Sequence, residues 1–192
     1  MLPLENNGWF VAIVGPSGAG KDTIINAVHK LVGDKSRFLF IRRIITRDAV
    51  DEDNISVTEA KFIQLRKQGA FSLNWFAHGI HYGLPNNIKA AIGNGKIVIA
   101  NISRECVKEA NQLFGRVFVV EINAPIEILR NRLANRERED KAHIEERLER
   151  AALPIDLPKQ VAYHYIDNSQ DVKVAVRALF DILQALDNGK VP

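Results

Sequence analysis

Nine consecutive residues near the N-terminus carry the most recognisable chemistry of this chain. They read Gly15-Pro16-Ser17-Gly18-Ala19-Gly20-Lys21-Asp22-Thr23, and the first seven match the pattern G-x-x-x-x-G-K. Small residues let successive backbone N–H groups turn toward an anion, and a following helix adds the positive end of its dipole. Lys21 supplies a mobile charge suited to the β- and γ-phosphates of a nucleotide. All nine residues are therefore candidates for nucleotide phosphate binding.

The position after the lysine departs from this pattern. It usually carries a Ser or Thr whose hydroxyl meets Mg²⁺, and here it is Asp22. Thr23 is one helical residue further on, a rotation of about 100°, so we expect its hydroxyl to face away from the metal. Magnesium takes carboxylate oxygens. Asp22 is therefore the candidate metal ligand, directly or through a water molecule.

The arginines are unevenly distributed, although the formal net charge is only +3. One group comprises Arg42, Arg43 and Arg47, and a second is crowded between residues 130 and 150. These groups predict anionic ligands at two places. Glutamates and aspartates alternate with the second group, which breaks any continuous basic patch, so we do not expect nucleic-acid binding.

Length and composition indicate one α/β domain with an inserted lobe. The 192 residues are 46% hydrophobic, enough to close a substantial core. The single Cys106 excludes an intramolecular disulfide and a cysteine-cluster metal site, and we expect it to be a packed residue. The first apolar run has no basic leader and is too short to cross a bilayer, so we expect a cytoplasmic protein without membrane contact.

The phosphate loop is expected to join a strand over 9–14 to a helix over 24–32, after which strands and helices alternate. Further strands are expected over 38–45, 70–77, 96–101, 116–122 and 163–166, a turn over 78–83, and helices over 58–68, 85–92, 104–114, 125–135, 142–152 and 171–186. The segments 97–100 and 117–120 are apolar throughout, as strands covered on both faces are. They belong at the centre of a parallel sheet.

Two parts of the chain interrupt this alternation. We expect a single domain over 1–192, with its core in 8–37, 85–130 and 152–188, an inserted lobe over about 38–84 and a lid over about 131–151. Residues 135–140 are charged or amide at every position. This composition is typical of a solvated, hinged hairpin over a site.

The loop at 15–23, Gly83 after His81-Tyr82, and the arginine-rich lid resemble the guanylate kinase superfamily over nearly the whole chain. The resemblance implies a P-loop, nucleoside-monophosphate-kinase-like fold of three layers, with a central parallel sheet, an acceptor-binding lobe and an arginine-rich lid. Segments 20–23, 45–48, 82–83, 101–104 and 129–138 are most similar to the ribose 1,5-bisphosphate phosphokinase family. That resemblance implies phosphorylation of α-D-ribose 1,5-bisphosphate by ATP, with Mg²⁺, to 5-phospho-α-D-ribose 1-diphosphate (PRPP) and ADP in phosphonate breakdown.

The departures from guanylate kinases fall where guanine would bind. The lobe's guanine-recognising Glu is replaced near Leu73, the second guanine-reading acid falls at Asn101-Ile102, and a pocket tyrosine is replaced near Asn54. A substrate N–H left without an acceptor can cost factors of roughly 10⁴ to 10⁵ in discrimination. We therefore expect GMP to be a poor acceptor.

The resemblance assigns the acceptor phosphate to Arg47 and Tyr82. Asn101, Ser103 and Arg104 follow a central strand at its carboxyl end, where doubly wound sheets bind ligands, so we expect them to contact the sugar. Structural roles are open for three of these residues: a surface ion pair for Arg47, packing for Tyr82 and a helix N-cap for Ser103.

The arginines of the expected lid would offset the negative charge of the two substrates. The acceptor phosphate is largely anionic at neutral pH, so the reaction needs no base but must bring two polyanions together. By resemblance, Arg132 and Arg136 flank the lid hinge and Arg147 lies on its returning helix. Lys21, Arg132 and Arg147 are the catalytic candidates, and Arg136 and Asn168 are placed beside the nucleotide. The alternatives are a solvated helix face for Arg147 and a turn for Asn168.

Two other functions are compatible with the residues. One is a nucleoside monophosphate kinase of relaxed specificity. The other is a non-catalytic, guanylate-kinase-like binding module with a groove for a partner protein. The intact Gly20-Lys21 pair and the lid arginines argue against the second.

Overall fold

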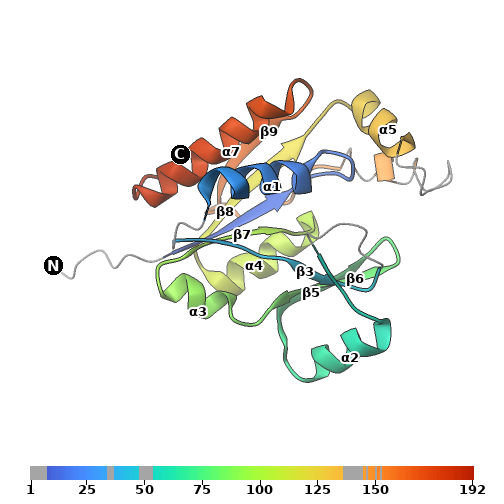
Figure 1. Ribbon diagram of the computed structural model, residues 1–192, viewed down its shortest axis with the longest axis vertical. Coiled ribbons are helices and arrows are strands. Elements are labelled where there is room, and N and C mark those ends of the chain that lie inside the picture. The colour runs from blue at the N-terminus through green and yellow to red at the C-terminus, as the bar shows by residue number, and fades with distance from the viewer. Residues whose placement is uncertain are drawn as a thin grey trace.

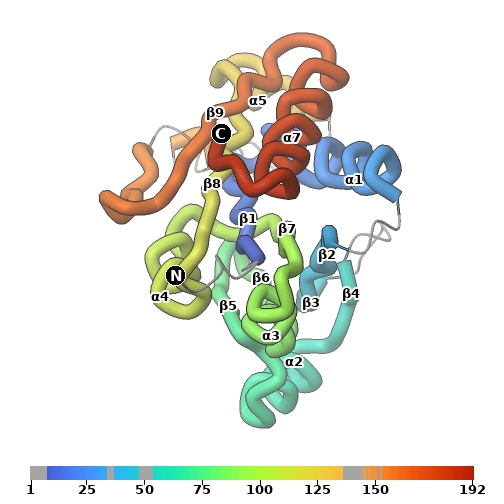
Figure 2. The backbone as a smooth tube through the Cα atoms, turned by 90° about the vertical axis from the view of Figure 1, so that its left-hand side faces the viewer, coloured from blue at the N-terminus to red at the C-terminus, as the bar shows by residue number. Residues whose placement is uncertain are grey.

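A computed structural model describes residues 8–33, 37–47, 54–135, 145, 147–149, 151 and 153–192. Its centre is a five-stranded sheet (Figure 1) in the order β2-β7-β1-β8-β9, which can be followed in Figure 2, and neighbouring strands run parallel. The strands are β1 (Trp9–Val14), β2 (Phe38–Phe40), β7 (Ile97–Asn101), β8 (Val117–Asn123) and β9 (Ala162–Asp167). The apolar segments β7 and β8 flank β1, which confirms their predicted central position.

Helices cover both faces of this sheet (Figure 1). On one face lie α1 (Lys21–Val32) and α7 (Val172–Asp187), and on the other lie α3 (Ile88–Gly93) and α4 (Val107–Phe114). A 3₁₀ turn, Arg104–Cys106, precedes α4, and α5 (Ile126–Ala134) follows β8. The three layers confirm the predicted α/β fold class.

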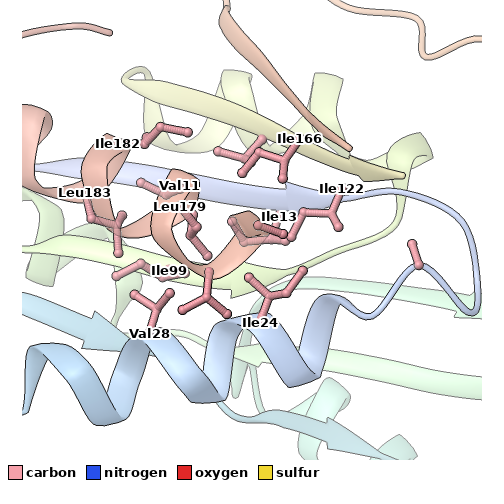
Figure 3. Close-up of a cluster of buried hydrophobic side chains, with 14 of the residues drawn as sticks. Val11, Ile13, Ile24, Val28, Ile99, Ile122, Ile166, Leu179, Ile182 and Leu183 are labelled. Carbon is pink, nitrogen blue, oxygen red and sulfur yellow. The ribbon is translucent and has the colours of Figure 1, made fainter. Parts of the chain in front are cut away.

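Alternate residues of each central strand enter two different hydrophobic clusters. Val11 and Ile13 pack with Ile24 and Leu179 on the α1 and α7 side (Figure 3). The intervening Phe10 and Ala12 pack on the α3 and α4 side. Because successive strand residues point to opposite faces, a sheet covered on both sides needs apolar residues at every position.

The inserted lobe contains a second sheet, in the order β4-β3-β6-β5 (Figure 2). Its elements are β3 (Arg43–Ile45), β4 (Asn54–Ser56), α2 (Glu59–Lys67), β5 (Phe71–Ala77) and β6 (Ile80–Pro85). Phe62 of α2 stacks on Phe71 and on His81, with ring centroids 4.6 and 5.2 Å apart. Leu73 and Leu84 join the cluster on the α3 and α4 side, so the lobe packs directly on the core.

The structure corrects two predicted elements of the lobe. The strand predicted over 38–45 is two strands, because β2 pairs with β7 of the central sheet and β3 pairs with β4 and β6. The turn predicted over 78–83 was also wrong beyond Gly79, since β6 begins at Ile80. Gly83 looked like a turn residue, but a Cβ there would meet the Phe71 ring at 2.7 Å, so it permits close packing within the sheet.

The other elements agree with the prediction to within a few residues. The helix after the phosphate loop begins at Lys21, three residues earlier than expected. Strand β4 was not predicted, and it contains only three residues. The helix predicted over 142–152 lies largely outside the described residues.

Candidate active site

A cavity of ≈ 540 Å³ lies between the phosphate loop, the lobe sheet and the carboxyl end of β7. Six of its lining residues are cationic and three are acidic. The cationic residues are Lys21, Arg43, Arg47, Arg104, Lys108 and Arg147, and the acidic residues are Asp22, Glu105 and Asp156. The excess of positive charge suits a polyanionic ligand.

The phosphate loop leaves β1 at Val14 and enters α1 at Lys21. Gly20, the residue before the helix, has φ 87° and ψ 18°, in the left-handed region. A Cβ at Gly20 would meet Asn168 Nδ2 at 2.6 Å. The glycine therefore allows both the turn of the loop and the close approach of a residue far along the chain.

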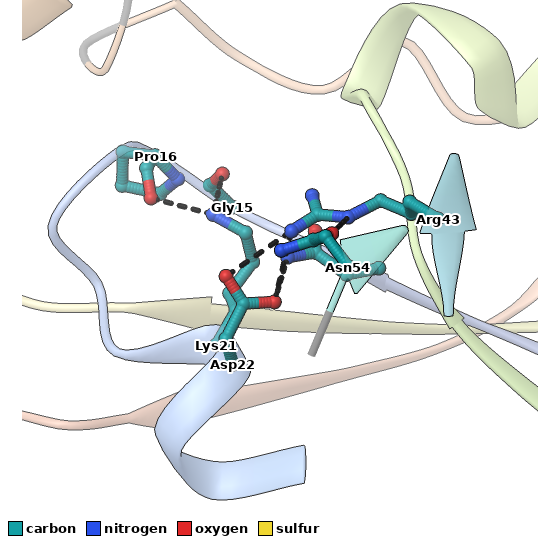
Figure 4. A network of polar contacts seen from close by, with 7 residues as sticks. Gly15, Pro16, Lys21, Asp22, Arg43 and Asn54 are labelled. Carbon is teal, nitrogen blue, oxygen red and sulfur yellow. Dashed lines mark hydrogen bonds and ion pairs between the residues drawn. The ribbon is translucent and has the colours of Figure 1, made fainter. Parts of the chain in front are cut away.

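Lys21 lies back over the loop that precedes it (Figure 4). Its Nζ donates to the carbonyl oxygens of Gly15 and Pro16, each at 2.7 Å. These contacts hold the ammonium at the cavity wall, together with the loop backbone. Thr23, on the first turn of α1, also lines the cavity.

Asp22 is the hub of a polar network between the loop, the lobe and β7. Its Oδ1 accepts from Asn101 Nδ2 at 2.7 Å, and its two oxygens accept from Arg43 Nη2 at 3.1 and 3.2 Å (Figure 4). Burial alone would raise the pKa of Asp22, but Arg43, Asn101 and Lys21 together hold that pKa below its ordinary value. The side chain is therefore a carboxylate at neutral pH.

This carboxylate fits the way in which Mg²⁺ binds with nucleotides. Magnesium is commonly held by one or two carboxylates, several waters and the substrate phosphates. Asp22 lines the cavity beside the phosphate loop, and about half of its side chain is exposed. In the described part of the chain no group of three or more His, Cys, Asp or Glu residues could hold a metal by itself.

Arg43 is a site residue that the sequence analysis grouped with other arginines but did not single out. Besides Asp22, it donates from Nε to Asn54 Oδ1 at 3.0 Å. Its guanidinium carbon lies 5.6 Å from the centroid of the Tyr82 ring, and that ring stacks on Trp75 at 5.2 Å. Only the pairing of β3 with β4 and β6 reveals that Arg43 points into the cavity.

The residues predicted to contact the acceptor all line this cavity. They are Arg47 and Tyr82 in the lobe, Asn101 at the end of β7, and Ser103 and Arg104 after that strand. Arg104 also donates from Nη1 to Leu153 O at 2.7 Å, so it contacts the chain just after the segment that was predicted to form a lid. Ser103 occupies the N-cap position of the 3₁₀ turn without a side-chain capping hydrogen bond in the described structure.

Arg147 contacts the phosphate loop directly, and Arg132 is linked to the loop through Asn168. Arg147 Nη1 donates to Ser17 Oγ at 3.0 Å. Arg132 Nη2 donates to the carbonyl oxygen of Asn168 at 2.9 Å, and Asn168 Nδ2 donates to Ala19 O at 2.8 Å. Arg136 lies outside the described residues.

Two buried polar atoms in this second group have no partner within the described part of the chain. They are Arg132 Nη1 and Asn168 Oδ1. A buried polar group without a partner costs stability unless a ligand or water satisfies it. The pair therefore offers one donor and one acceptor beside the loop.

The neighbourhood of the cavity also contains residues with structural roles. Cys106 is buried, and burial with Glu109 and Glu105 nearby raises the pKa of its thiol to about 12, which confirms a packed residue. His81 stacks on Phe62 and does not line the cavity. Leu73 is fully buried in the core cluster.

The chain is similar to curated proteins over most of its length. It is 42% identical over 181 residues to the ribose 1,5-bisphosphate phosphokinase PhnN of Brucella melitensis, covering 93% of each chain. It is 36% identical over 181 residues to the protein of that name from Rhizobium etli, covering 93% of this chain and 91% of the relative. The chain belongs to the ribose 1,5-bisphosphate phosphokinase family.

Members of this family are kinases, and the chain is accordingly an enzyme of that class. No family model matches the sequence. A solved guanylate kinase from Anaplasma phagocytophilum superposes with a TM-score of 0.67 at 20% identity, covering 94% of this chain and 86% of that one. This likeness shows that the chain has a guanylate-kinase-like fold.

A solved sugar kinase from a Janibacter species superposes more loosely, with a TM-score of 0.57 at 16% identity. That chain is covered to 99% and this one to 96%.

In this phosphokinase family member, none of the described helices is long and apolar enough to cross a membrane.

Proposed function

We propose that this enzyme transfers the γ-phosphoryl group of ATP to the 1-phosphate of α-D-ribose 1,5-bisphosphate, giving PRPP and ADP. The observation that carries the proposal is the cationic cavity, which lies between an intact phosphate loop and a lobe that contributes Arg43, Arg47 and Tyr82 to its lining. Membership of the phosphokinase family supports the identity of the acceptor. We further propose that the enzyme is cytoplasmic and acts in phosphonate breakdown.

The reaction requires positioning more than acid–base chemistry. An oxygen of the acceptor 1-phosphate forms a bond to the γ-phosphorus, and the bond from that phosphorus to the β,γ-bridging oxygen breaks. The electron pair of that bond leaves with ADP. Because the acceptor oxygen is largely anionic at neutral pH, no proton has to be removed from it.

Residues on the nucleotide side bind and orient the ATP phosphates. The backbone of residues 15–20 cradles the β-phosphate, and Lys21 leaves its loop carbonyls to bind the β- and γ-phosphates. Asp22 would hold Mg²⁺, which when bound neutralises charge on these phosphates. Arg132 and Arg147 stabilise the charge that develops during transfer. Arg136 and Asn168 are assigned to the nucleotide.

Residues on the acceptor side bind the sugar bisphosphate. Arg47 and Tyr82 bind phosphate, and Asn101, Ser103 and Arg104 contact the sugar. Leu73 is buried in the core rather than exposed in the cavity, so the lobe has no carboxylate for guanine at that position. We also propose a division of the chain into a core, an acceptor lobe over about 38–84 whose first strand, β2, belongs to the central sheet, and a lid over about 131–151.

The test is an ADP-release assay with Mg·ATP and one of four acceptors: ribose 1,5-bisphosphate, GMP, AMP or ribose 5-phosphate. We expect turnover with the bisphosphate alone, at typical kinase rates of roughly 1 to 100 s⁻¹. A Lys21→Met preparation serves as the control for contaminating kinases. Turnover with GMP or AMP would instead identify a nucleoside monophosphate kinase. If no ADP is released with any of the four acceptors, the non-catalytic binding module would be favoured.

A further inference from the structure

We propose that Arg43 binds the acceptor phosphate that receives the phosphoryl group, and that Asp22 holds the Arg43 guanidinium in position until the acceptor arrives. This inference rests on the proposed function and assigns a further specificity-determining residue to it. It arises from the position of Arg43 between the lobe sheet and the phosphate loop.

The surroundings of Arg43 fix its guanidinium at the cavity. Asn54 accepts from Nε and Asp22 accepts from Nη2 (Figure 4). The guanidinium carbon lies over the Tyr82 ring, 5.6 Å from its centroid. Trp75 stacks almost parallel to Tyr82, with an interplanar angle of 6°. Only 14% of the Arg43 side chain is exposed. A guanidinium oriented in this way loses little conformational entropy when it binds a ligand.

The contacts also leave Arg43 able to take an anion. Within the described part of the chain, Nη1 has no hydrogen-bond partner, and Arg43 lines the cavity. Phosphate and carboxylate oxygens both accept the forked hydrogen bonds of a guanidinium. An incoming phosphate can therefore bind Nη1 first and then compete with Asp22 for Nη2. That exchange would free an Asp22 oxygen beside the nucleotide.

The acceptor has two phosphates, and the lobe has two cavity-lining arginines four residues apart, Arg43 and Arg47. Arg43 reaches Asp22, the residue next to Lys21, and is therefore the lobe arginine adjoining the phosphate loop. Arg47 is exposed beyond the end of β3. We therefore assign the reacting 1-phosphate to Arg43 and the 5-phosphate to Arg47, which refines the expectation that Arg47 binds a phosphate of the acceptor.

The competing interpretation is a structural ion pair that ties the lobe to α1. In that case, removing either partner would lower stability and leave acceptor affinity unchanged. In the proposed arrangement, the two partners act on acceptor binding in opposite directions. Arg43 attracts the phosphate, whereas Asp22 competes with it for the same guanidinium.

The first experiment measures binding of ribose 1,5-bisphosphate by calorimetry without nucleotide. We expect Arg43→Met to raise the Kd about 10- to 100-fold, because a charge-assisted hydrogen-bonding partner is lost. The KM for Mg·ATP should change less than about threefold. Arg42→Met is the matched control, because Arg42 is exposed, does not line the cavity and donates to the backbone oxygen of Asn54. An Arg43→Met Kd equal to that of wild type would overturn the proposal.

The second experiment uses Asp22→Ala in two backgrounds. With Arg43 present, we expect this substitution to tighten bisphosphate binding about tenfold, and with Arg43→Met in place the gain should shrink severalfold. Equal gains in both backgrounds would mean that Asp22 only repels the acceptor, which would contradict the exchange. If Arg43→Met fails to fold, as judged by circular dichroism, Arg43→Lys replaces it, and we then expect a smaller rise in Kd because the charge remains but the fork is lost.

These outcomes separate the inference from the proposed function. If wild-type enzyme neither binds nor phosphorylates the bisphosphate, the proposed function is wrong. If wild-type enzyme does both and Arg43→Met binds the bisphosphate equally well, the function stands and only the role of Arg43 is wrong.

Discussion

The phosphate loop and the acceptor lobe form the two sides of one cavity, but they are built differently. The loop is a contiguous stretch, and Lys21 contacts carbonyls only five and six residues away. The opposite wall is assembled from separate segments. Arg43 of the lobe and Asn101 of β7 both meet Asp22, from 21 and 79 residues away in the sequence.

This difference shows which parts of such a site can be recognised as a motif in the sequence. Backbone N–H groups bind phosphate whatever the neighbouring side chains are, so the constraint falls on loop shape and therefore on glycines. The acceptor side depends on side chains that strand pairing brings together.

The largest effect is expected from replacing Lys21, the side chain that the phosphate loop itself contributes to phosphate binding. We expect Lys21→Met to lower kcat/KM for the bisphosphate about 10²- to 10³-fold, because the phosphates lose a preorganised positive charge. Steady-state kinetics provides the measurement. Bisphosphate binding without nucleotide should stay within a few-fold of wild type, and a loss there as large as that caused by Arg43→Met would show that the two sides are not separable.

A second test asks whether the loop really is local. Gly20→Ala should destabilise the protein by about 2–4 kcal/mol, because a left-handed residue gains a side chain that meets Asn168. Gly69→Ala is the matched control. Gly69 also has a positive φ, of 69°, but a Cβ there would meet nothing within 4 Å. We expect a loss of about 1–2 kcal/mol at that position.

Urea unfolding measures both losses. In an Asn168→Ala background, the extra cost of Gly20→Ala should fall by about 1 kcal/mol, because the opposing Nδ2 is removed. If Gly20→Ala and Gly69→Ala cost the same, the contact with Asn168 does not constrain the loop. The phosphate loop would then depend only on residues near it in the sequence, in contrast to the lobe.

The smallest expected effect concerns the ion pair that joins the two sides. Because the folded-state pKa of Asp22 is lowered, its contribution to stability is full at neutral pH. That contribution begins to fall near the ordinary carboxyl pKa of 3.8 and is lost as the pH drops through the lower folded-state value. The difference in melting temperature between wild type and Asp22→Asn should therefore decrease as the pH is lowered from about 5 to about 3. A gap that stays constant over this range would contradict the assigned charge state.

Much of the fold could be predicted from local patterns. The apolar segments at β7 and β8 indicated a parallel sheet covered on both faces, and the helices α2 and α7 begin after Thr58 and Asp171, whose side chains cap them. The lobe was harder to predict. Three-residue strands such as β3 and β4 are too short to show a period, and their pairing depends on partners distant in sequence.

By itself, the sequence determined the phosphate loop, the order of the core elements and the likeness to a kinase superfamily. These follow from contiguous residues, because backbone shape and burial are encoded locally. Only the tertiary structure decided that Arg43 joins Asp22, that Asn54 orients it, and that Asn168 closes on Gly20. The physical reason is that a side-chain contact depends on strand register and on the packing of two sheets, and neither is written in any single stretch of the chain.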